Sequence, residues 1–264
     1  MRNPIITLLT DFGLKDHYVA SMKGVILSIN PRATVVDVTH QVTPQDIREA
    51  GFILANTYRY FPKGTIHLAV VDPGVGGPRK PILLVTDAHL FVGPDNGLFT
   101  FVMQREKRAK ALSLTDPARF LPRVSNTFHG RDLFAPVAGY LSLGIEPEAF
   151  GSPLASWVRL ETEEPAVKGR AMTGEVVHVD AFGNLISNIS EEALRRFSGG
   201  RPVVVRIGRR SAGPLRKTYG EGKKGEVLAL VGSGGFMEIS VREGNARRAL
   251  RIRKGEKVQV ELKY

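Results

Sequence analysis

The 264-residue chain contains no cysteine, which excludes disulfide bonds, thiolate metal ligands and cysteine nucleophiles. No apolar run approaches the roughly 20 residues that a membrane-spanning helix needs. The first ten residues hold one arginine and then a strand-like run that stops at Asp11, a pattern that does not fit a signal peptide. We therefore expect a cytoplasmic protein without a membrane partner, because reducing conditions suit a cysteine-free chain.

Motifs of several enzyme classes are also missing. The chain has no Gly-x-Ser-x-Gly nucleophile elbow, which disfavours a serine hydrolase. Its glycine-rich segment 74–77 lacks the Gly-Lys-Ser/Thr ending of a loop that binds nucleoside triphosphates. The histidines show no His-x-x-x-His spacing and no helical pairing with glutamate, so we expect no metal site.

Positive charge is concentrated in the shorter C-terminal part. Residues 1–160 contain 17 Lys and Arg against 13 Asp and Glu, whereas residues 161–264 contain 20 against 13. A basic excess can bind nucleic acid or another anionic ligand. The aromatic residues of this part are scattered, however, without the stacking platform of single-strand binders. A solvated basic surface is the simpler interpretation, and a nucleic-acid-binding barrel is the alternative.

The first part of the chain alternates strand and helix signals. Apolar residues at helical spacing predict a helix over 18–29, which Asn30-Pro31 closes. Together the signals predict an α/β domain with a central sheet over residues 1–160. Two more helices are predicted over 47–58 and 132–143, and strands over 4–10, 34–38, 65–71, 82–86 and 90–93, the last two as a pair.

The pattern changes after about residue 155. The charged segment 161–168 predicts a linker, and in the rest of the chain only 191–197 has a helical pattern. Glycine-rich turns separate short strands, which is typical of a small antiparallel β-barrel; we place this second domain at 170–264. The predicted strands are 174–179, 203–207, 227–231, 237–240 and 257–262.

Polar residues follow the predicted strands of the first domain. In open α/β sheets, ligands bind beyond the carboxyl ends of the strands. Asp11 follows the first strand and could accept hydrogen bonds from a ribose diol, or hold a turn or helix cap. Asp72 begins a loop rich in glycine and proline that could return Arg79 to face it, as a functional pair or as a structural ion pair.

His129 lies just before the predicted helix 132–143. Asp132 could cap that helix and leave the imidazole free to project. A carboxylate, a fixed cation and an imidazole suit acid–base chemistry or the positioning of a water molecule. An ordinary core or surface histidine is the alternative.

The second domain offers groups suited to a nucleoside. Phe182 could stack on a base, and the Asn184 amide could donate to and accept from a base edge. The same residues also fit a hairpin turn with a buried phenylalanine. Backbone amides around Ser233, in a glycine-rich turn, could hold a carboxylate.

Taken in order, these clusters resemble the S-adenosylmethionine hydroxide adenosyltransferase family, which is related to the fluorinating and chlorinating S-adenosylmethionine enzymes. The similarity covers roughly residues 5–246. It is carried by Leu-Thr-Asp-Phe-Gly at 9–13, Val-Asp-Pro-Gly-Val-Gly at 71–76, Gly-Pro-Asp-Asn-Gly at 93–97, Phe-His-Gly-Arg-Asp at 128–132 and Phe-Gly-Asn at 182–184.

This resemblance implies an N-terminal α/β domain, a C-terminal β-barrel, and homotrimers that hold the ligand between two subunits. It also implies a reaction without metal or cofactor. Water or hydroxide attacks the ribose 5′ carbon of S-adenosyl-L-methionine and gives adenosine and L-methionine. The alternatives are a halide-using adenosyl transferase, which the combination of Arg79 and His129 disfavours, and a protein that binds an adenosyl ligand without turnover.

The resemblance further implies roles for individual residues. Arg79 would stabilise developing hydroxide, His129 would position the water or accept its proton, and Asp72 would orient Arg79. The substrate-binding residues would be Asp11 for the ribose, Phe182 and Asn184 for the adenine, Asp180 for the methionine ammonium and Ser233 for its carboxylate.

Overall fold

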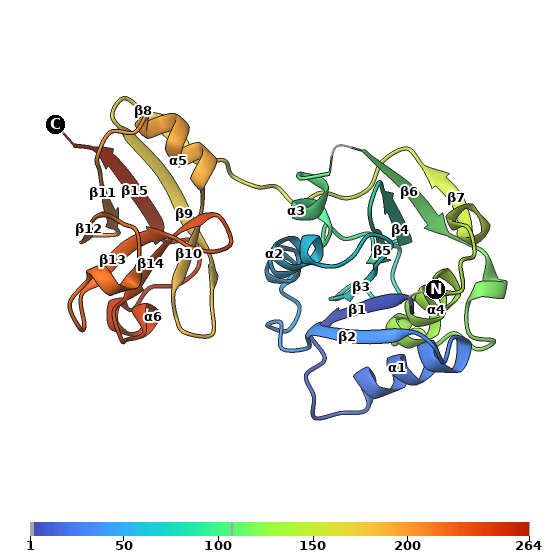
Figure 1. Cartoon of the computed structure of the whole chain (residues 1–264). Coiled ribbons are helices and arrows are strands. Elements are labelled where there is room, and N and C mark those ends of the chain that lie inside the picture. The colour runs from blue at the N-terminus through green and yellow to red at the C-terminus, as the bar shows by residue number, and fades with distance from the viewer. Residues whose placement is uncertain (1–2, 107, 264) are drawn as a thin grey trace. The chain divides into compact units, whose positions relative to one another are not determined.

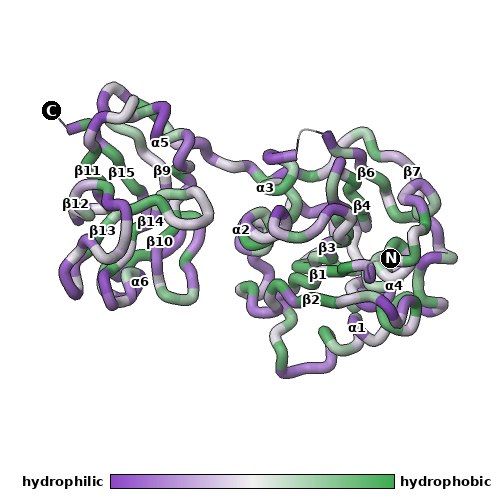
Figure 2. The backbone as a smooth tube through the Cα atoms, viewed as in Figure 1, coloured by the Kyte–Doolittle hydropathy of each residue, from purple (hydrophilic) through white to green (hydrophobic). Residues whose placement is uncertain are grey.

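The computed structural model describes residues 3–106 and 108–263, which form two compact units divided between Leu160 and Glu161 (Figure 1). Within these residues, no helix is both long enough and apolar enough to cross a membrane. Hydrophobic residues follow the central strands of each unit, as Figure 2 shows for β1 (Ile5–Thr10) and β3 (Ile66–Val70) of the first unit. Each unit therefore has a core of its own.

The first unit contains a seven-stranded mixed sheet in the order β2-β1-β3-β5-β4-β6-β7. The first four strands in that order pair in parallel, whereas β4, β6 and β7 join antiparallel. The carboxyl ends of the parallel strands therefore share one edge. The strands are β1 (Ile5–Thr10), β2 (Thr34–Thr39), β3 (Ile66–Val70), β4 (Pro81–Thr86), β5 (Leu90–Pro94), β6 (Ala109–Leu114) and β7 (Gly151–Leu154).

Helices cover both faces of this sheet. Successive residues of a strand point to opposite faces, so Leu8 packs in one core with α1 and α4, and Leu9 packs in another with α2. The prediction of an α/β domain with a central sheet is confirmed. The helices are α1 (Tyr18–Ile29), α2 (Ile47–Thr57), α3 (Thr100–Met103) and α4 (Ala135–Ser142), with a π-helical turn at Gly130–Phe134 and 3-10 turns at Tyr58–Tyr60, Pro117–Arg119 and Pro147–Phe150.

The second unit is a β-barrel. Seven strands close in the order β10-β14-β13-β12-β11-β15-β9, because β9 also pairs with β10, and β8 extends the sheet beyond β9. The predicted barrel is confirmed, with one parallel pair, β12–β13, among the antiparallel ones. The strands are β8 (Ala166–Lys168), β9 (Ala171–Val179), β10 (Leu185–Ser190), β11 (Val203–Ile207), β12 (Arg210–Arg216), β13 (Val227–Val231), β14 (Phe236–Val241) and β15 (Lys257–Leu262).

The structure corrects several local predictions in this half of the chain, where strands β10 and β12 were not predicted. The end of the predicted linker 161–168 is strand β8, paired with β9. The predicted helix 191–197 is present as α5 (Glu191–Ser198), but it is joined by α6 (Ala246–Leu250) and a 3-10 turn at Tyr219–Glu221. Strand β12 contains glycine and proline, which rarely occur inside strands, so local residue propensities do not predict it.

Candidate active site

The site begins at the shared edge of strands β1 and β3. Thr10 pairs with Val70 across these parallel strands, so Asp11 and the Val71-Asp72 segment leave the sheet at the same edge. The Asp11 carboxylate accepts a hydrogen bond of 2.8 Å from the backbone N–H of Gln45. This contact fixes Asp11 at the sheet edge and leaves its other oxygen without a partner among the described residues.

The loop after β3 returns the chain to Asp72. Two turns close it: Val75 N–H donates to the Asp72 carbonyl at 3.2 Å, and Gly77 N–H donates to the Gly74 carbonyl at 3.0 Å. Gly76 has a φ of +75°, and a Cβ there would lie 2.3 Å from the Asn126 carbonyl oxygen. The glycine therefore lets this loop press against the segment that leads to His129.

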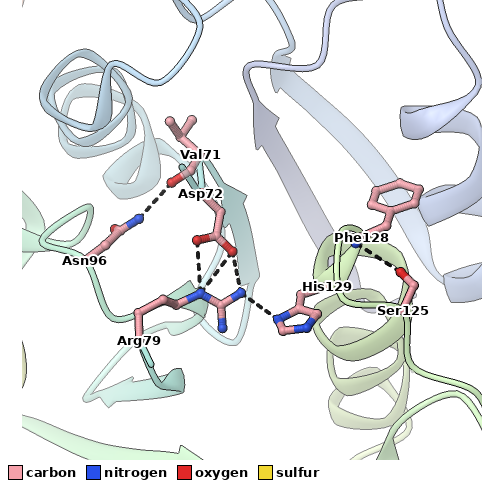
Figure 3. Close-up of polar contacts among 7 residues, drawn as sticks. All are labelled: Val71, Asp72, Arg79, Asn96, Ser125, Phe128 and His129. Carbon is pink, nitrogen blue, oxygen red and sulfur yellow. Dashed lines mark hydrogen bonds and ion pairs between the residues drawn. The ribbon is translucent and has the colours of Figure 1, made fainter. Parts of the chain in front are cut away.

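Arg79 joins Asp72 to His129 (Figure 3). Its Nε lies 3.0 Å from both carboxylate oxygens of Asp72, and its Nη2 donates to Asp72 Oδ2 as well. The two side chains are only 9% and 5% exposed. The same Nη2 lies 2.7 Å from His129 Nδ1, and the guanidinium carbon lies 5.4 Å from the centre of the Phe134 ring. The structure thus brings the three predicted catalytic residues into one partly buried chain of contacts.

The contact with Arg79 determines the tautomer of His129. A guanidinium can only donate hydrogen bonds, so Nδ1 must accept and the ring proton lies on Nε2. Burial lowers the pKa of His129 below its usual value, and the charge of Arg79 lowers it further, against the opposing charges of Asp72 and Asp132. At neutral pH the imidazole is therefore uncharged and presents an Nε2–H donor.

Asp132 does not act as the predicted helix cap. It lies within the π-helical turn at Gly130–Phe134 with no exposed surface. Its carboxylate accepts from Ser125 N–H at 2.8 Å and from Arg131 Nε at 2.6 Å. These bonds fold the segment before His129 back on itself, so Asp132 shapes the loop that presents the imidazole.

Two further features of this region have no counterpart in the roles predicted from sequence. Asn96 Nδ2 donates to the Val71 carbonyl at 2.8 Å, which fixes the backbone just before Asp72 (Figure 3). Phe128 packs edge-on against Phe12 and Tyr18, with ring centres 5.8 and 5.2 Å apart. The motif at 93–97 pointed to Asn96, whereas Tyr18 was recognisable only as a helix residue.

The barrel holds the other predicted residues in two turns. Asp180 accepts from Phe182 N–H, Asn184 N–H and Asn184 Nδ2 at 2.8–3.0 Å, which closes the turn between β9 and β10. Phe182 is 78% exposed, so the alternative of a buried turn phenylalanine is wrong, while Asn184 is buried. Ser233 is exposed in the turn between β13 and β14. Phe182 and Asn184 line a cavity of about 540 Å³ together with Tyr219.

The predicted site residues thus fall into two groups, one in each unit. Asp11, Asp72, Arg79 and His129 belong to the first unit, and the remaining four belong to the barrel. Among the residues that the structure describes, no three His, Asp or Glu side chains gather as metal ligands would.

Comparison with known proteins assigns both units to the same protein family. Residues 6–151 match the SAM hydroxide adenosyltransferase N-terminal domain, and residues 174–259 match the C-terminal domain of the same family. The chain is 39% identical to an (R)-S-adenosyl-L-methionine hydrolase of Thermus thermophilus, over 97% of this chain and 98% of that protein. It is 34% identical to a hydrolase of the same name from Methanocaldococcus jannaschii, over 94% and 92%.

Similarity to halogenating enzymes is weaker. A fluorinase of Nocardia brasiliensis is 26% identical over 99% of this chain and 98% of its own length. Among solved structures, an uncharacterised conserved protein from Thermotoga maritima superposes with a TM-score of 0.91 at 39% identity, covering 97% of this chain and 99% of that one. The similarity therefore extends over both units and their order in the chain.

Proposed function

The chain belongs to the SAM hydroxide adenosyltransferase family, and from that membership we propose that it hydrolyses S-adenosyl-L-methionine to adenosine and L-methionine. The oxygen of water forms a bond to the ribose 5′ carbon while the bond from that carbon to sulfur breaks. The bonding electrons leave with sulfur, which becomes the neutral thioether of methionine, and one proton leaves the attacking water. Sulfur needs no general acid because its positive charge already makes it a good leaving group.

The observation that carries the proposal is the partly buried Asp72–Arg79–His129 chain. Asp72 holds the guanidinium through Nε and Nη2, so Nη1 is the one nitrogen of Arg79 without a partner among the described residues. The Nη1 protons and the His129 Nε2–H are the donors left for a water oxygen. Two donors would orient the water and stabilise negative charge on its oxygen during the attack.

The same contacts indicate which group can accept the proton that the attacking water loses. Both oxygens of Asp72 and the Nδ1 of His129 already accept from Arg79. We therefore propose that His129 positions the water as a donor, and that the proton passes to solvent rather than to the imidazole. The reaction needs no metal or cofactor in this scheme.

We further propose that the active site is completed between subunits of a homotrimer, with the α/β domain of one subunit facing the barrel of its neighbour. The family resemblance implies this arrangement, and the division of the binding residues between two separate units supports it. Light scattering of the protein as it elutes from a size-exclusion column should give three times the mass of one chain.

Mixing two impaired variants tests the shared site directly. Arg79→Ala damages the α/β domain and Phe182→Ala the barrel, and activity is measured at substrate concentrations well below KM. If sites form between subunits, co-expressed mixed trimers should be more active than either variant alone, because some sites combine two intact halves. If each site lies within one subunit, every site carries one defect, and the mixture should not exceed the more active variant.

Chromatography of the products tests the reaction itself. The purified protein is incubated with S-adenosyl-L-methionine and a chelator, with and without chloride or fluoride. We expect adenosine and methionine in equal amounts, unaffected by chelator or halide. A 5′-halo-adenosine would assign the chain to the halogenating relatives, and binding without any product would leave it as a binding protein.

A further inference from the structure

Strand β14 carries a buried glutamate on the outer face of the barrel. Met237 and Ile239 point into the barrel core, so Glu238 between them points to the opposite face. Glu238 is nevertheless only 6% exposed. A buried carboxylate is costly unless it is paired or hydrogen-bonded, and its partners therefore indicate its purpose.

The partners of Glu238 leave one oxygen unused. Oε1 accepts from the Tyr219 hydroxyl and from Ser240 Oγ, the latter at 3.2 Å. Oε2 lies against the turn between β13 and β14, where a Cβ on Gly232 would be 2.2 Å from it. Within the described part of the chain, no hydrogen-bond donor reaches Oε2 and no cation pairs with the carboxylate. Glu238 thus differs from buried Asp72, which has Arg79 beside it.

The position of Glu238 connects the two ligand-binding turns of the barrel. It pairs across strands with Ile186, two residues after Asn184. The turn against which Oε2 rests contains Ser233. Tyr219, which donates to Glu238, lines the cavity of about 540 Å³ with Phe182 and Asn184. The carboxylate therefore lies between residues proposed for the adenine and the residue proposed for the methionine carboxylate.

Asp180, the residue matched to the methionine ammonium, is already engaged. Its two oxygens accept three hydrogen bonds from the turn that it closes. Its charge nevertheless acts on Glu238: burial raises the pKa of Glu238 and the Asp180 charge raises it further, against the lowering effect of the Tyr219 and Ser240 hydroxyls. Two carboxylates without a cation between them are stabilised by a positively charged ligand.

From this geometry we infer that Glu238 is the counter-charge for the α-ammonium group of the methionine part of the substrate, with Oε2 as the acceptor. The inference rests on the proposed function, and it places Glu238 beside Asp180 as a second counter-charge, while Asp180 also holds the turn of Phe182 and Asn184. The ammonium would replace the missing cation and satisfy the unused oxygen, so substrates with an amino acid moiety are favoured over plain nucleosides.

Two non-reacting ligands separate this role from a structural one. S-adenosyl-L-homocysteine carries the ammonium, whereas 5′-methylthioadenosine shares its adenosine and thioether but lacks the amino acid. Glu238→Gln keeps the shape of the side chain and removes its charge. We expect it to weaken binding of S-adenosyl-L-homocysteine by roughly 10–100-fold, the range for a lost charge-assisted hydrogen bond. Binding of 5′-methylthioadenosine should stay within about twofold, as judged by calorimetry.

Glu192→Gln is the matched control, since it removes the same charge from an exposed position at the start of α5. It should change neither affinity. Equal weakening of both ligands by Glu238→Gln, or no change in either, would overturn the inference. Loss of the proposed function is a separate result, because it would appear as wild-type protein that releases no adenosine from S-adenosyl-L-methionine.

A measurement on the wild-type protein keeps the inference testable if the variant does not fold. The titratable groups facing Glu238 are Asp180 and Tyr219. As pH falls and Glu238 gains a proton, the preference for S-adenosyl-L-homocysteine over 5′-methylthioadenosine should shrink. A ratio of the two affinities that stays constant from pH 8 down to pH 4, which lies below the usual pKa of 4.5 that burial raises in Glu238, would contradict the assignment.

Discussion

The two domains present their functional side chains in opposite ways. In the α/β domain, Asp72 and Arg79 are 5% and 9% exposed and bound to each other. In the barrel, Phe182 is 78% exposed, and Glu238 is buried with no cation paired to it among the residues that the structure describes. Contacts within the chain organise the first arrangement, and we propose that ligand completes the second. Damage to the first should therefore reduce turnover, and damage to the second should reduce affinity.

Arg79 should give the largest effect on turnover. Arg79→Ala removes the donor proposed for the attacking oxygen, and we expect kcat to fall by about 10²–10³-fold, as for one lost oxyanion donor. Affinity for S-adenosyl-L-homocysteine should change little. Arg119→Ala, a change to a half-buried arginine paired with Asp116, serves as the control and should keep full activity. An equal loss of affinity and turnover in Arg79→Ala would erase the distinction between the domains.

Two substitutions of His129 sharpen the assignment of its role. His129→Ala should lower kcat by about 10²-fold through loss of the Nε2–H donor. His129→Gln places an amide donor at the position of Nε2 and should recover at least a tenth of the wild-type rate. An imidazole that accepts the proton could not be replaced by an amide, so equally inactive Ala and Gln variants would show that His129 is the base.

Acid should destabilise the α/β domain through a second buried histidine. His67 has no exposed surface, and burial, with the neighbouring His89, lowers its pKa to about 3. The unfolded chain binds this proton near pH 6.5, so the stabilising contribution is complete above pH 6.5 and is lost as pH falls toward 3. At pH 5 the loss amounts to about 2 kcal/mol of unfolding free energy.

The test is chemical denaturation at several pH values. His67→Asn can keep a hydrogen bond to Thr7, which now contacts Nδ1 at 2.7 Å, but it cannot titrate. The free energy of unfolding of this variant should be lower than that of the wild type at pH 7, but it should change less as the pH falls. Parallel curves for the wild type and the variant would show that His67 does not cause the acid sensitivity.

Among these substitutions, Phe182→Ala should have the smallest effect on activity. Its ring contributes little to barrel stability because it is largely exposed. Phe182→Ala should therefore leave the melting temperature unchanged and raise KM about tenfold, the lower range for loss of a base-stacking aromatic. Phe197→Ala, at a partly buried core position, should lower the melting temperature instead. A fall in kcat without a change in KM would contradict a binding role for Phe182.

Local patterns predicted much of this protein. The helix over 18–29 was predicted with its bounds, because Val19, Met22 and Ile26 repeat at helical spacing and Asn30-Pro31 ends the run. The ends of β1 and β3 placed Asp11 and Asp72 at one edge. Strand β12 was missed because its pairing with β11 and β13 outweighs its poor local propensity.

The sequence by itself therefore determined the two-part α/β and barrel architecture, the family, and the residue types available for the reaction. These depend on periodicity and on motifs that neighbouring residues carry. Only the tertiary structure decided that Arg79 fixes the His129 tautomer and that Asp132 holds a loop rather than a helix end. It alone revealed Glu238 as a buried carboxylate with no cation beside it in the described part of the chain, because burial and hydrogen-bond partners depend on segments far apart in the chain.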